Sequence, residues 1–435
     1  MEMVQLEEKV IKKPSELSML QKLKKLVVHN MVTVFFIILC LIGFFYSGLT
    51  FAFLLNDIVT RMVRNSFLVL ALLLPVMAGM GLNFAIVLGA MCAQAAMIFV
   101  THWGIGGMPG IGVTLIITTP LAVFLGFLTG KLFNRTKGQE MITGLILGFF
   151  SNGIYQLIFL ILLGSVIPFT NETLVLSSGV GLRTTIDLAG GLRYAIDDLW
   201  RLPFTISAMI FGAGVGVHGI YRYMKGIPLL AKEPKNKKYL VTSTLGLFLI
   251  VWAFYIQSTT ASFINMINVP MLTVAFIVLM CVFTSFFART KLGQDFRTVG
   301  QDRHIASVSG IHSDRTRLTA MILSTTFAAW GHLIFLQNLG TFSTYGSHEQ
   351  IGFYSVAALL IGGASVTNAK ISHALLGTFL FHTLFIVSPL AGRNLFGDAQ
   401  LGEYFRVFVA YGVIGVSLVM HAWRTQIEGR RKLSA

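Results

Sequence analysis

The sequence predicts an all-α, polytopic transmembrane helical bundle of about ten to twelve segments, some of them broken. Two observations predict this class. First, 55% of the 435 residues are hydrophobic and only 12% are charged, whereas a soluble chain needs roughly a quarter of its residues charged. Second, apolar runs long enough to cross about 30 Å of hydrocarbon recur along the chain. This composition excludes a soluble enzyme.

The net charge of +15 would suggest an acidic partner for a soluble protein. In a membrane protein, an excess of Lys and Arg on the cytoplasmic side accounts for the charge instead, so no nucleic-acid partner is predicted. Cys40, Cys92 and Cys281 each lie in an apolar run. Their spacing fits neither a disulfide framework nor a metal site, and no cofactor or metal ligand is predicted.

Uninterrupted apolar runs predict the simplest spans. These runs are 31–55, 111–133, 141–168, 204–221, 239–257, 268–288, 318–336 and 404–423. Segment 1–30 precedes them, and between Ser15 and Val27 it carries Leu residues at helical spacing with Lys residues between them. That pattern is typical of an amphipathic helix lying along the cytoplasmic membrane surface.

Two longer apolar regions are interrupted. The interrupting residues are Pro75, Gly79, Gly81 and Gly89 in region 66–100, and Gly362, Gly363 and 365–370 in region 353–389. Each region is expected to hold two helices separated by a break. A break leaves backbone donors and acceptors free at membrane depth, which is tolerated only beside a cavity or a ligand. The breaks are therefore candidates for the lining of a solute path.

The basic residues predict the orientation of the chain. With the amino terminus and the tail 426–435 in the cytoplasm, most of the 33 Lys and Arg residues fall on the inner side, as the positive-inside rule requires. The remaining basic residues fall outside and are Arg61, Arg64, Arg183, Arg193, Arg201, Arg393 and Arg406. The longest outer loop is 170–203, which is polar enough to stand in water.

The source of energy for transport is predicted from what the spans lack. None of the 18 acidic residues falls inside a predicted span, whereas carriers driven by protons or sodium usually keep a carboxylate at the membrane midplane. This argues against ion coupling. The sequence also has no GxxxxGK[ST] phosphate-binding loop. If ATP drives transport, the ATPase is expected to be another chain.

The inner loop 289–317 has the composition of a docking element. Gly293 and Gly300 are expected to bracket a short helix, and Asp302 is expected to cap the next one. A helix of this kind, parallel to the membrane, suits contact with a soluble motor. An ordinary solvated basic loop is an equally good interpretation of the composition alone.

This loop resembles that of the permease subunits of bacterial ABC importers of the branched-chain amino acid and ribose type, which include simple sugar and nucleoside permeases. The family pattern is similar to T-x-x-G-x-x-x-R-A-x-G-x-N-x-x-A-A-x-x-S-G-I. The chain matches it at Thr290, Gly293, Arg297, Gly300, Ala306, Ser309, Gly310 and Ile311. It departs at Thr298, Asp302 and Ile305. Weaker glycine patterns extend the resemblance over about 60–425, within the predicted permease domain 31–425.

The resemblance implies a transport subunit of the bacterial inner membrane that has no enzymatic activity and imports a small polar solute by alternating access. It implies three protein partners besides membrane lipid: ABC ATPase subunits, a second permease copy or paralogue, and an extracytoplasmic solute-binding protein. Sugars and nucleosides are the favoured solutes, and branched-chain amino acids stay possible. The alternative is an ion-coupled secondary transporter that acts as a single chain.

Polar residues at the breaks are the candidates for the solute path. Asn83 at the first break and Gln94 further along could hydrogen-bond an uncharged solute, and bonding between helices is the alternative role for both. Glu349 is expected at the outer end of the second broken region, either at the gate or in an exposed loop. Gly362 and Gly363 complete the predicted path.

Overall fold

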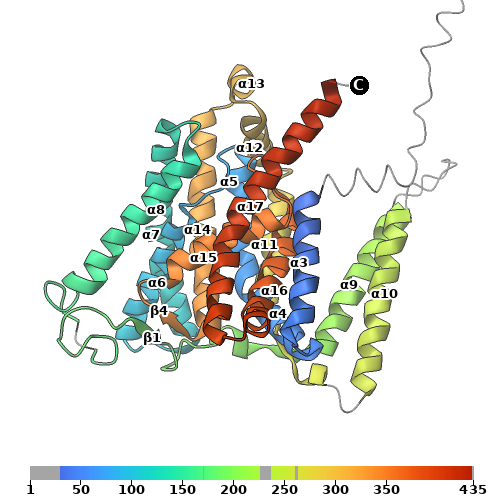
Figure 1. The fold of residues 1–435 in the computed structure, drawn as a ribbon. Coiled ribbons are helices and arrows are strands. Elements are labelled where there is room, and N and C mark those ends of the chain that lie inside the picture. Colours follow the sequence, from blue (N-terminus) through green and yellow to red (C-terminus); the bar gives the residue numbers. More distant parts are fainter. Residues whose placement is uncertain (1–29, 170, 226–236, 260–262, 434–435) are drawn as a thin grey trace, which may run out of the picture.

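The computed structural model describes residues 30–169, 171–225, 237–259 and 263–433, and these form a bundle of helices with a few short strands (Figure 1). The longer helices are α3 (Met31–Ser47), α4 (Phe51–Ala71), α6 (Ile86–His102), α7 (Gly107–Arg135), α8 (Glu140–Gln156), α9 (Phe204–Lys225), α10 (Lys237–Ser258), α11 (Met271–Phe287), α12 (Lys291–Gln301), α14 (Ser313–Leu339), α15 (Ser347–Ile361), α16 (Ile371–Phe396) and α17 (Ala399–Leu433). The short ones are α5 (Leu73–Met77), η1 (Leu157–Leu162), η2 (Asp197–Leu199), η3 (Phe263–Met266) and α13 (Arg303–Val308).

Seven helical segments among the described residues are long and apolar enough to cross a membrane, and the bent pair α11–α12 would add an eighth. The helices α3 and α6 are shorter and also apolar. The prediction of an all-α polytopic membrane protein is therefore confirmed. The amphipathic helix predicted within 1–30 lies outside the described residues, except for Asn30.

The bundle has two different ends. The helices α12 and α13 stand at one end, called the α13 end below, and the irregular segment after α8 lies at the other (Figure 1). Two antiparallel ladders occupy this second end, called the ladder end. Strand β1 (Thr185–Asp187) pairs with β4 (Thr341–Ser343), and β2 (Arg201–Pro203) pairs with β3 (Asn268–Pro270). Both ladders join segments that are distant in sequence.

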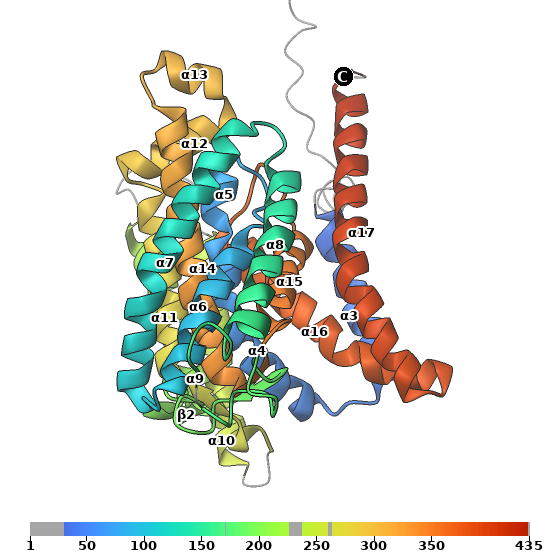
Figure 2. The same ribbon diagram turned by 90° about the vertical axis from the view of Figure 1, so that its left-hand side faces the viewer.

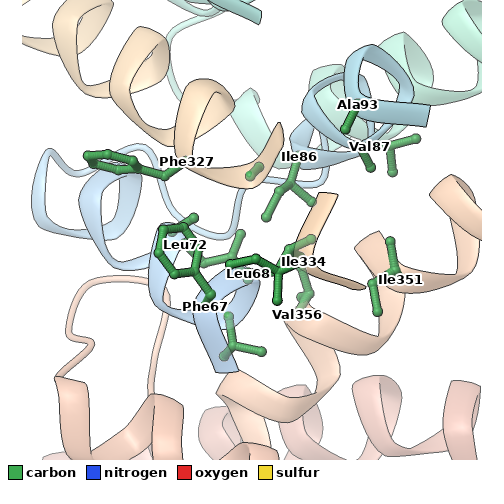
Figure 3. Packing of buried hydrophobic residues seen from close by; sticks show 14 of the residues in the cluster. Phe67, Leu68, Leu72, Ile86, Val87, Ala93, Phe327, Ile334, Ile351 and Val356 are labelled. Carbon is green, nitrogen blue, oxygen red and sulfur yellow. The ribbon is translucent and has the colours of Figure 1, made fainter. Parts of the chain in front are cut away.

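The core is built where α4, α6, α14 and α15 pack together. Figure 3 shows Phe67 and Leu68 of α4 facing Ile334 of α14 and Val356 of α15. Small residues permit the close approach: a Cβ added to Gly331 of α14 would lie 3.0 Å from the Cα of Leu68. Such small-residue contacts replace the hydrophobic effect as the basis of helix packing inside a membrane.

The two predicted breaks are present. Between α5 and α6, Gly79 and Gly81 have φ angles of +71°, which disfavour any residue with a Cβ. Between α15 and α16, Gly363 has a φ angle of +91°. The breaks touch, because a Cβ on Gly81 would lie 3.0 Å from the side chain of Val366.

Gly89 was predicted at a break, and this prediction is wrong. It lies inside α6, where a Cβ would collide with the backbone oxygen of Thr325 in α14. A glycine required for close helix packing and a glycine required for a break look the same in a single sequence.

The run 31–55 was predicted as one span, and the structure divides it. Helix α3 ends at Ser47, and Gly48 follows with a φ angle of +67°, so α4 begins separately at Phe51. Apolar residues on both sides of Gly48 conceal this turn in the sequence.

Arg61 and Arg64 were predicted in an outer loop and instead lie within α4, a candidate span. The Arg64 Nε donates to Asn338 Oδ1 at 2.6 Å, and the Arg61 guanidinium lies 5.1 Å from the centre of the Phe385 ring. Asp57 lies in the same helix, and Glu140 begins another candidate span. The prediction that no acidic residue lies in a span is therefore wrong, because partnered charges inside a bundle resemble a loop in sequence.

Candidate functional site

Helix α12 is an amphipathic helix bent by 75° from α11. Its residues Gly293, Phe296 and Val299 are buried because they recur every three residues and share one face. The hydroxyl of Thr290 caps the helix by accepting from the Gly293 N–H at 3.2 Å. Gly293 and Gly300 were expected to bracket a helix, but both lie inside α12 and serve close packing instead.

Helix α13 is short and capped at both ends. Asp302 accepts from the N–H groups of His304 at 2.7 Å and Ile305 at 3.1 Å, as predicted for a cap. The hydrogen bond from the Ile305 N–H has the largest effect and that from the His304 N–H the next largest, and both lower the pKa of the Asp302 carboxyl. At the other end, Gly310 has a φ angle of +78°, and the Ile311 N–H bonds to the Ala306 carbonyl at 2.9 Å, which forms a Schellman motif.

The outward side of α13 is apolar although it is exposed. Ile305 is 58% exposed and Val308 is 77% exposed, while Ala306 is fully buried beneath them. Figures 1 and 2 show α13 projecting beyond the neighbouring helices. Arg297 and Ser309 are also exposed at this end.

A basic cleft lies beside this apolar tip. It has a volume of about 570 Å³ and is lined by residues of α13, the start of α14 and the turn before α8. The basic lining residues are Lys137, Arg303, His312 and Arg315, and the one acidic lining residue, Asp314, pairs with Lys137. An exposed apolar tip beside a basic cleft is the pattern of a protein-docking surface with an acidic partner.

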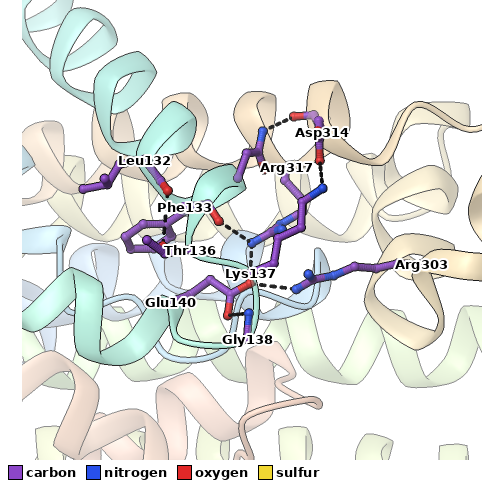
Figure 4. A network of polar contacts seen from close by, with 10 residues as sticks. Leu132, Phe133, Thr136, Lys137, Gly138, Glu140, Arg303, Asp314 and Arg317 are labelled. Carbon is purple, nitrogen blue, oxygen red and sulfur yellow. Dashed lines mark hydrogen bonds and ion pairs between the residues drawn. The ribbon is translucent and has the colours of Figure 1, made fainter.

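A buried ion network holds α13 to the bundle (Figure 4). Glu140, the first residue of α8, accepts from the Arg303 Nη2 at 2.7 Å and from the Arg317 Nη2. Arg317 is fully buried, and its Nη2 also donates to the Phe133 carbonyl at 3.2 Å. One carboxylate therefore joins α8, α13 and α14. The sequence does not predict this network, because its only sign there is a single acidic residue in a basic segment.

Helix α12 touches the first break directly. A Cβ on Gly79 would lie 2.7 Å from the Cα of Gly300, and a Cβ on Gly300 would collide with the backbone oxygen of Met77. Only two glycines allow this approach. Helix α12 therefore packs directly on the end of α5 and the start of the break.

The break holds an amide without a hydrogen-bond partner. Asn83 is fully buried, and among the described residues neither its Oδ1 nor its Nδ2 has a partner. An unsatisfied buried polar group lowers stability. The Asn83 amide is therefore suited to a hydrogen-bond partner, such as a solute, that is bound only part of the time. Its position keeps it a candidate for the solute path.

Gln94 is engaged within the bundle. It is fully buried in α6, and its Nε2 donates to the Tyr155 hydroxyl at 3.0 Å and to the Thr344 carbonyl. Its Oε1 lies 3.4 Å from His332 Nε2. The geometry favours the interhelical role over contact with a solute, because both ends of the amide already have partners.

Glu349 lies in the first turn of α15 at the ladder end. Its Oε2 accepts from Asn152 Nδ2 of α8 at 3.1 Å, and it lines a small hollow with the rings of Phe84, Phe149 and Phe353. Phe353 lies 6.0 Å from Phe84 and 6.4 Å from Phe149 between ring centres. Figure 2 shows α15 between α8 and α17.

Gly362 and Gly363 are used for packing. A Cβ on Gly362 would collide with the carbonyl of His373 in α16, and a Cβ on Gly363 would lie 2.9 Å from the hydroxyl of Thr33 in α3. Neither glycine is placed in the hollow. Among the described residues, no group of three or more His, Cys, Asp or Glu side chains could hold a metal ion.

This arrangement of spans, helix breaks and a projecting helix pair is typical of polytopic membrane transport proteins. The chain belongs to the family described as "branched-chain amino acid transport system / permease component", which it matches over residues 53–418. The resemblance drawn from the loop 289–317 is therefore confirmed.

A curated relative supports a narrower comparison. The chain is 28% identical over 93 residues to the nucleoside ABC transporter permease protein NupB of Lactococcus lactis subsp. cremoris (strain MG1363). The match covers 20% of this chain and 25% of the relative, so the chain spans about a quarter of the length of that relative. No solved structure matches the chain.

Proposed function

We propose that the chain is the permease subunit of an ATP-driven importer in the bacterial inner membrane, and that it moves a small polar solute by alternating access. The observation that carries this proposal is the contact of α12 with the first break at Gly300 and Gly79. It connects an exposed docking surface to a break at membrane depth. The chain itself supplies no ATP site, and ATP is hydrolysed by a partner ATPase.

The ATPase docks at the α13 end. The exposed side chains of Ile305 and Val308 enter an apolar groove on the partner, and the basic cleft beside them receives its acidic residues. This end is therefore cytoplasmic, and α3 begins on the same side of the bundle (Figure 1), which fits the cytoplasmic amino terminus expected from the positive-inside rule. The ladder end then faces the solute-binding protein.

The solute path follows the face between α8 and α17, and a second permease copy or paralogue closes it. The hollow at Glu349 has a volume of about 10 Å³, which is too small for a solute, so it has to widen during alternating access. In the widened state the rings of Phe84 and Phe353 supply flat apolar surfaces for a base, and Glu349 with Asn152 supplies acceptors and donors for sugar hydroxyls. A nucleoside presents both kinds of surface. The name of the curated relative supports the same class, with simple sugars as the second choice.

The docking test is a pull-down of the tagged chain in mild detergent with an ATPase assay of the eluate. The wild-type chain should bring an ATPase with it, and the double variant Ile305→Asp, Val308→Asp should lose it. The matched control is Ser178→Asp, which adds a charge at an exposed position of the ladder end. If the double variant still brings the ATPase with it, the docking surface lies elsewhere on the chain.

The solute test is uptake of labelled uridine and ribose by the assembled complex in proteoliposomes. Phe353→Ala should raise the KM for uridine about tenfold, because stacking of a base on an aromatic ring contributes about 1–3 kcal/mol. Equal KM values in wild type and variant would exclude the hollow as the solute site. A chain that transports alone, driven by an ion gradient, would instead establish the secondary-transporter alternative, which the family match disfavours.

A further inference from the structure

An apolar groove runs between α9 and the helices behind it. It has a volume of about 660 Å³, and its walls include Met62 of α4, Phe211 of α9, Val278 of α11 and Ile371 of α16. Phe211 is 62% exposed and Val278 is 48% exposed. Because α4, α9 and α16 are candidate spans, the groove opens into the hydrocarbon of the membrane.

The groove changes character along α11. Val278, Val282 and Phe286 are exposed at four-residue intervals, so they form one stripe on the helix surface. Ser285 and then Arg289 continue this lining at the α13 end. Among the residues that line the groove, Arg289 carries the single charge.

The groove is open because of the way in which α9 and α10 are held. These two helices pack closely on each other, since a Cβ on Gly212 would lie 2.8 Å from the Gly246 carbonyl. They contact the rest of the chain mainly through β2, β3 and η3 at the ladder end. Figure 1 shows the hairpin of α9 and α10 standing apart from the bundle toward the α13 end.

We infer that this groove binds one phospholipid with an anionic headgroup. An acyl chain fills the apolar walls, which offer almost no hydrogen-bonding groups, and the headgroup phosphate pairs with the Arg289 guanidinium. Basic pockets between transmembrane helices on the cytoplasmic side favour anionic lipids in this way. The choice of leaflet rests on the proposed function, which makes the α13 end cytoplasmic.

The bound lipid lies next to the coupling element. Arg289 immediately precedes Thr290, whose hydroxyl caps α12. A headgroup on Arg289 therefore contacts the start of the helix that touches the first break through Gly300. Anionic lipid at this site tunes the position of α12, and transport depends on lipid composition as a result.

Native mass spectrometry of the detergent-solubilised chain tests the inference, with phosphatidylglycerol and phosphatidylcholine as probes. The wild type should retain one phosphatidylglycerol in preference to phosphatidylcholine. Arg289→Gln should weaken that retention about fivefold, as expected for one basic residue. Val282→Trp should reduce the retention of both lipids, because the indole fills the groove. Arg135→Gln removes an exposed charge from the same end, outside the groove, and should retain phosphatidylglycerol as the wild type does.

Retention that is equal in the wild type, Arg289→Gln and Val282→Trp overturns the inference. A dimer that is present in the wild type and dissociated by Val282→Trp also overturns the inference, because it would show that another copy of the chain fills the groove. The readout is lipid bound per chain, and it is independent of ATP and of any solute. Failure of the proposed function and failure of the lipid site are therefore distinguishable.

Discussion

The two helix breaks differ in what they touch. The first, between α5 and α6, meets α12 through Gly79 and Gly300 and holds the amide of Asn83, which has no hydrogen-bond partner in the described part of the chain. The second, between α15 and α16, meets neighbouring spans: Gly362 packs on α16 and Gly363 packs near Thr33 of α3. The comparison teaches that one break is in contact with the helix pair proposed to dock the ATPase, whereas the other fixes the crossing of helices within the bundle.

The largest expected effect separates these roles. Gly300→Val should abolish transport while leaving the amount of inserted protein unchanged, because its side chain displaces α12 from the carbonyl of Met77. Gly362→Val should instead lower the amount of folded protein, because it separates α15 from α16. Uptake and the yield of monodisperse chain measure the two outcomes.

The control for both is Gly153→Val in α8, where a Cβ would meet nothing within 4 Å. It should leave uptake and yield near the wild-type values. If the Gly300 variant transports at the wild-type rate, the contact with the first break is not the coupling path.

The next effect concerns the anchor of α13. Glu140→Ala leaves the buried Arg317 guanidinium without its carboxylate, and the loss of one partner of a buried ion pair costs about 3–5 kcal/mol. The thermal melting temperature of the purified chain should fall sharply. Lys137 and Asp314 form a solvent-exposed ion pair with a distance of 2.9 Å. Lys137→Gln removes this pair and should lower the free energy of unfolding by less than about 1 kcal/mol. Equal losses for the two variants would contradict the assignment.

A third comparison uses two buried amides. Gln94→Ala should destabilise the chain by about 1–3 kcal/mol for each group left without a partner, because the Tyr155 hydroxyl loses its donor. Asn83→Ala should leave the melting temperature unchanged or raise it, and should raise the KM for the solute. A loss of stability at Asn83 as large as that at Gln94 would show that the Asn83 amide is a structural group.

The smallest effect is at the cap of α13. The N–H groups of Ile305 and His304 lower the pKa of Asp302, so its stabilising effect is present above the unfolded pKa of about 3.9 and is lost as the pH falls through the lower, folded value. The contribution of Asp302 to ATPase binding should therefore be constant from pH 8 to pH 5, so the ratio of wild-type binding to Asp302→Ala binding should not change over this range. Asp302→Asn should preserve binding, since the amide oxygen still accepts, whereas Asp302→Ala should weaken it. A dependence on pH between 5 and 8 that disappears in Asp302→Asn would contradict this prediction.

The fold class and the helix caps of the loop 289–317 could be predicted because they depend on local patterns. Hydropathy predicts spans, and Thr290, Asp302 and Gly310 occupy positions that a cap or a turn demands. The breaks at Gly79, Gly81 and Gly363 follow from the same local chemistry, since each glycine has a positive φ angle.

The remaining features depend on contacts between distant segments. Gly89 looks like Gly81 in sequence, but its role is set by Thr325 of α14. Arg64 is stable inside a span because Asn338 accepts from it, and a single sequence does not contain that pairing. The Glu140 network was missed for the same reason.

The two strand ladders have a consequence for biogenesis. Ile186 of β1 pairs with Phe342 of β4, so the segment after α8 leaves the ribosome long before its partner exists. At about 5–20 residues per second, β1 waits on the order of ten seconds or more with open edges. The ladder end is therefore completed late in synthesis, after α14 has been inserted, and a truncated chain would present unpaired strands to quality-control proteases.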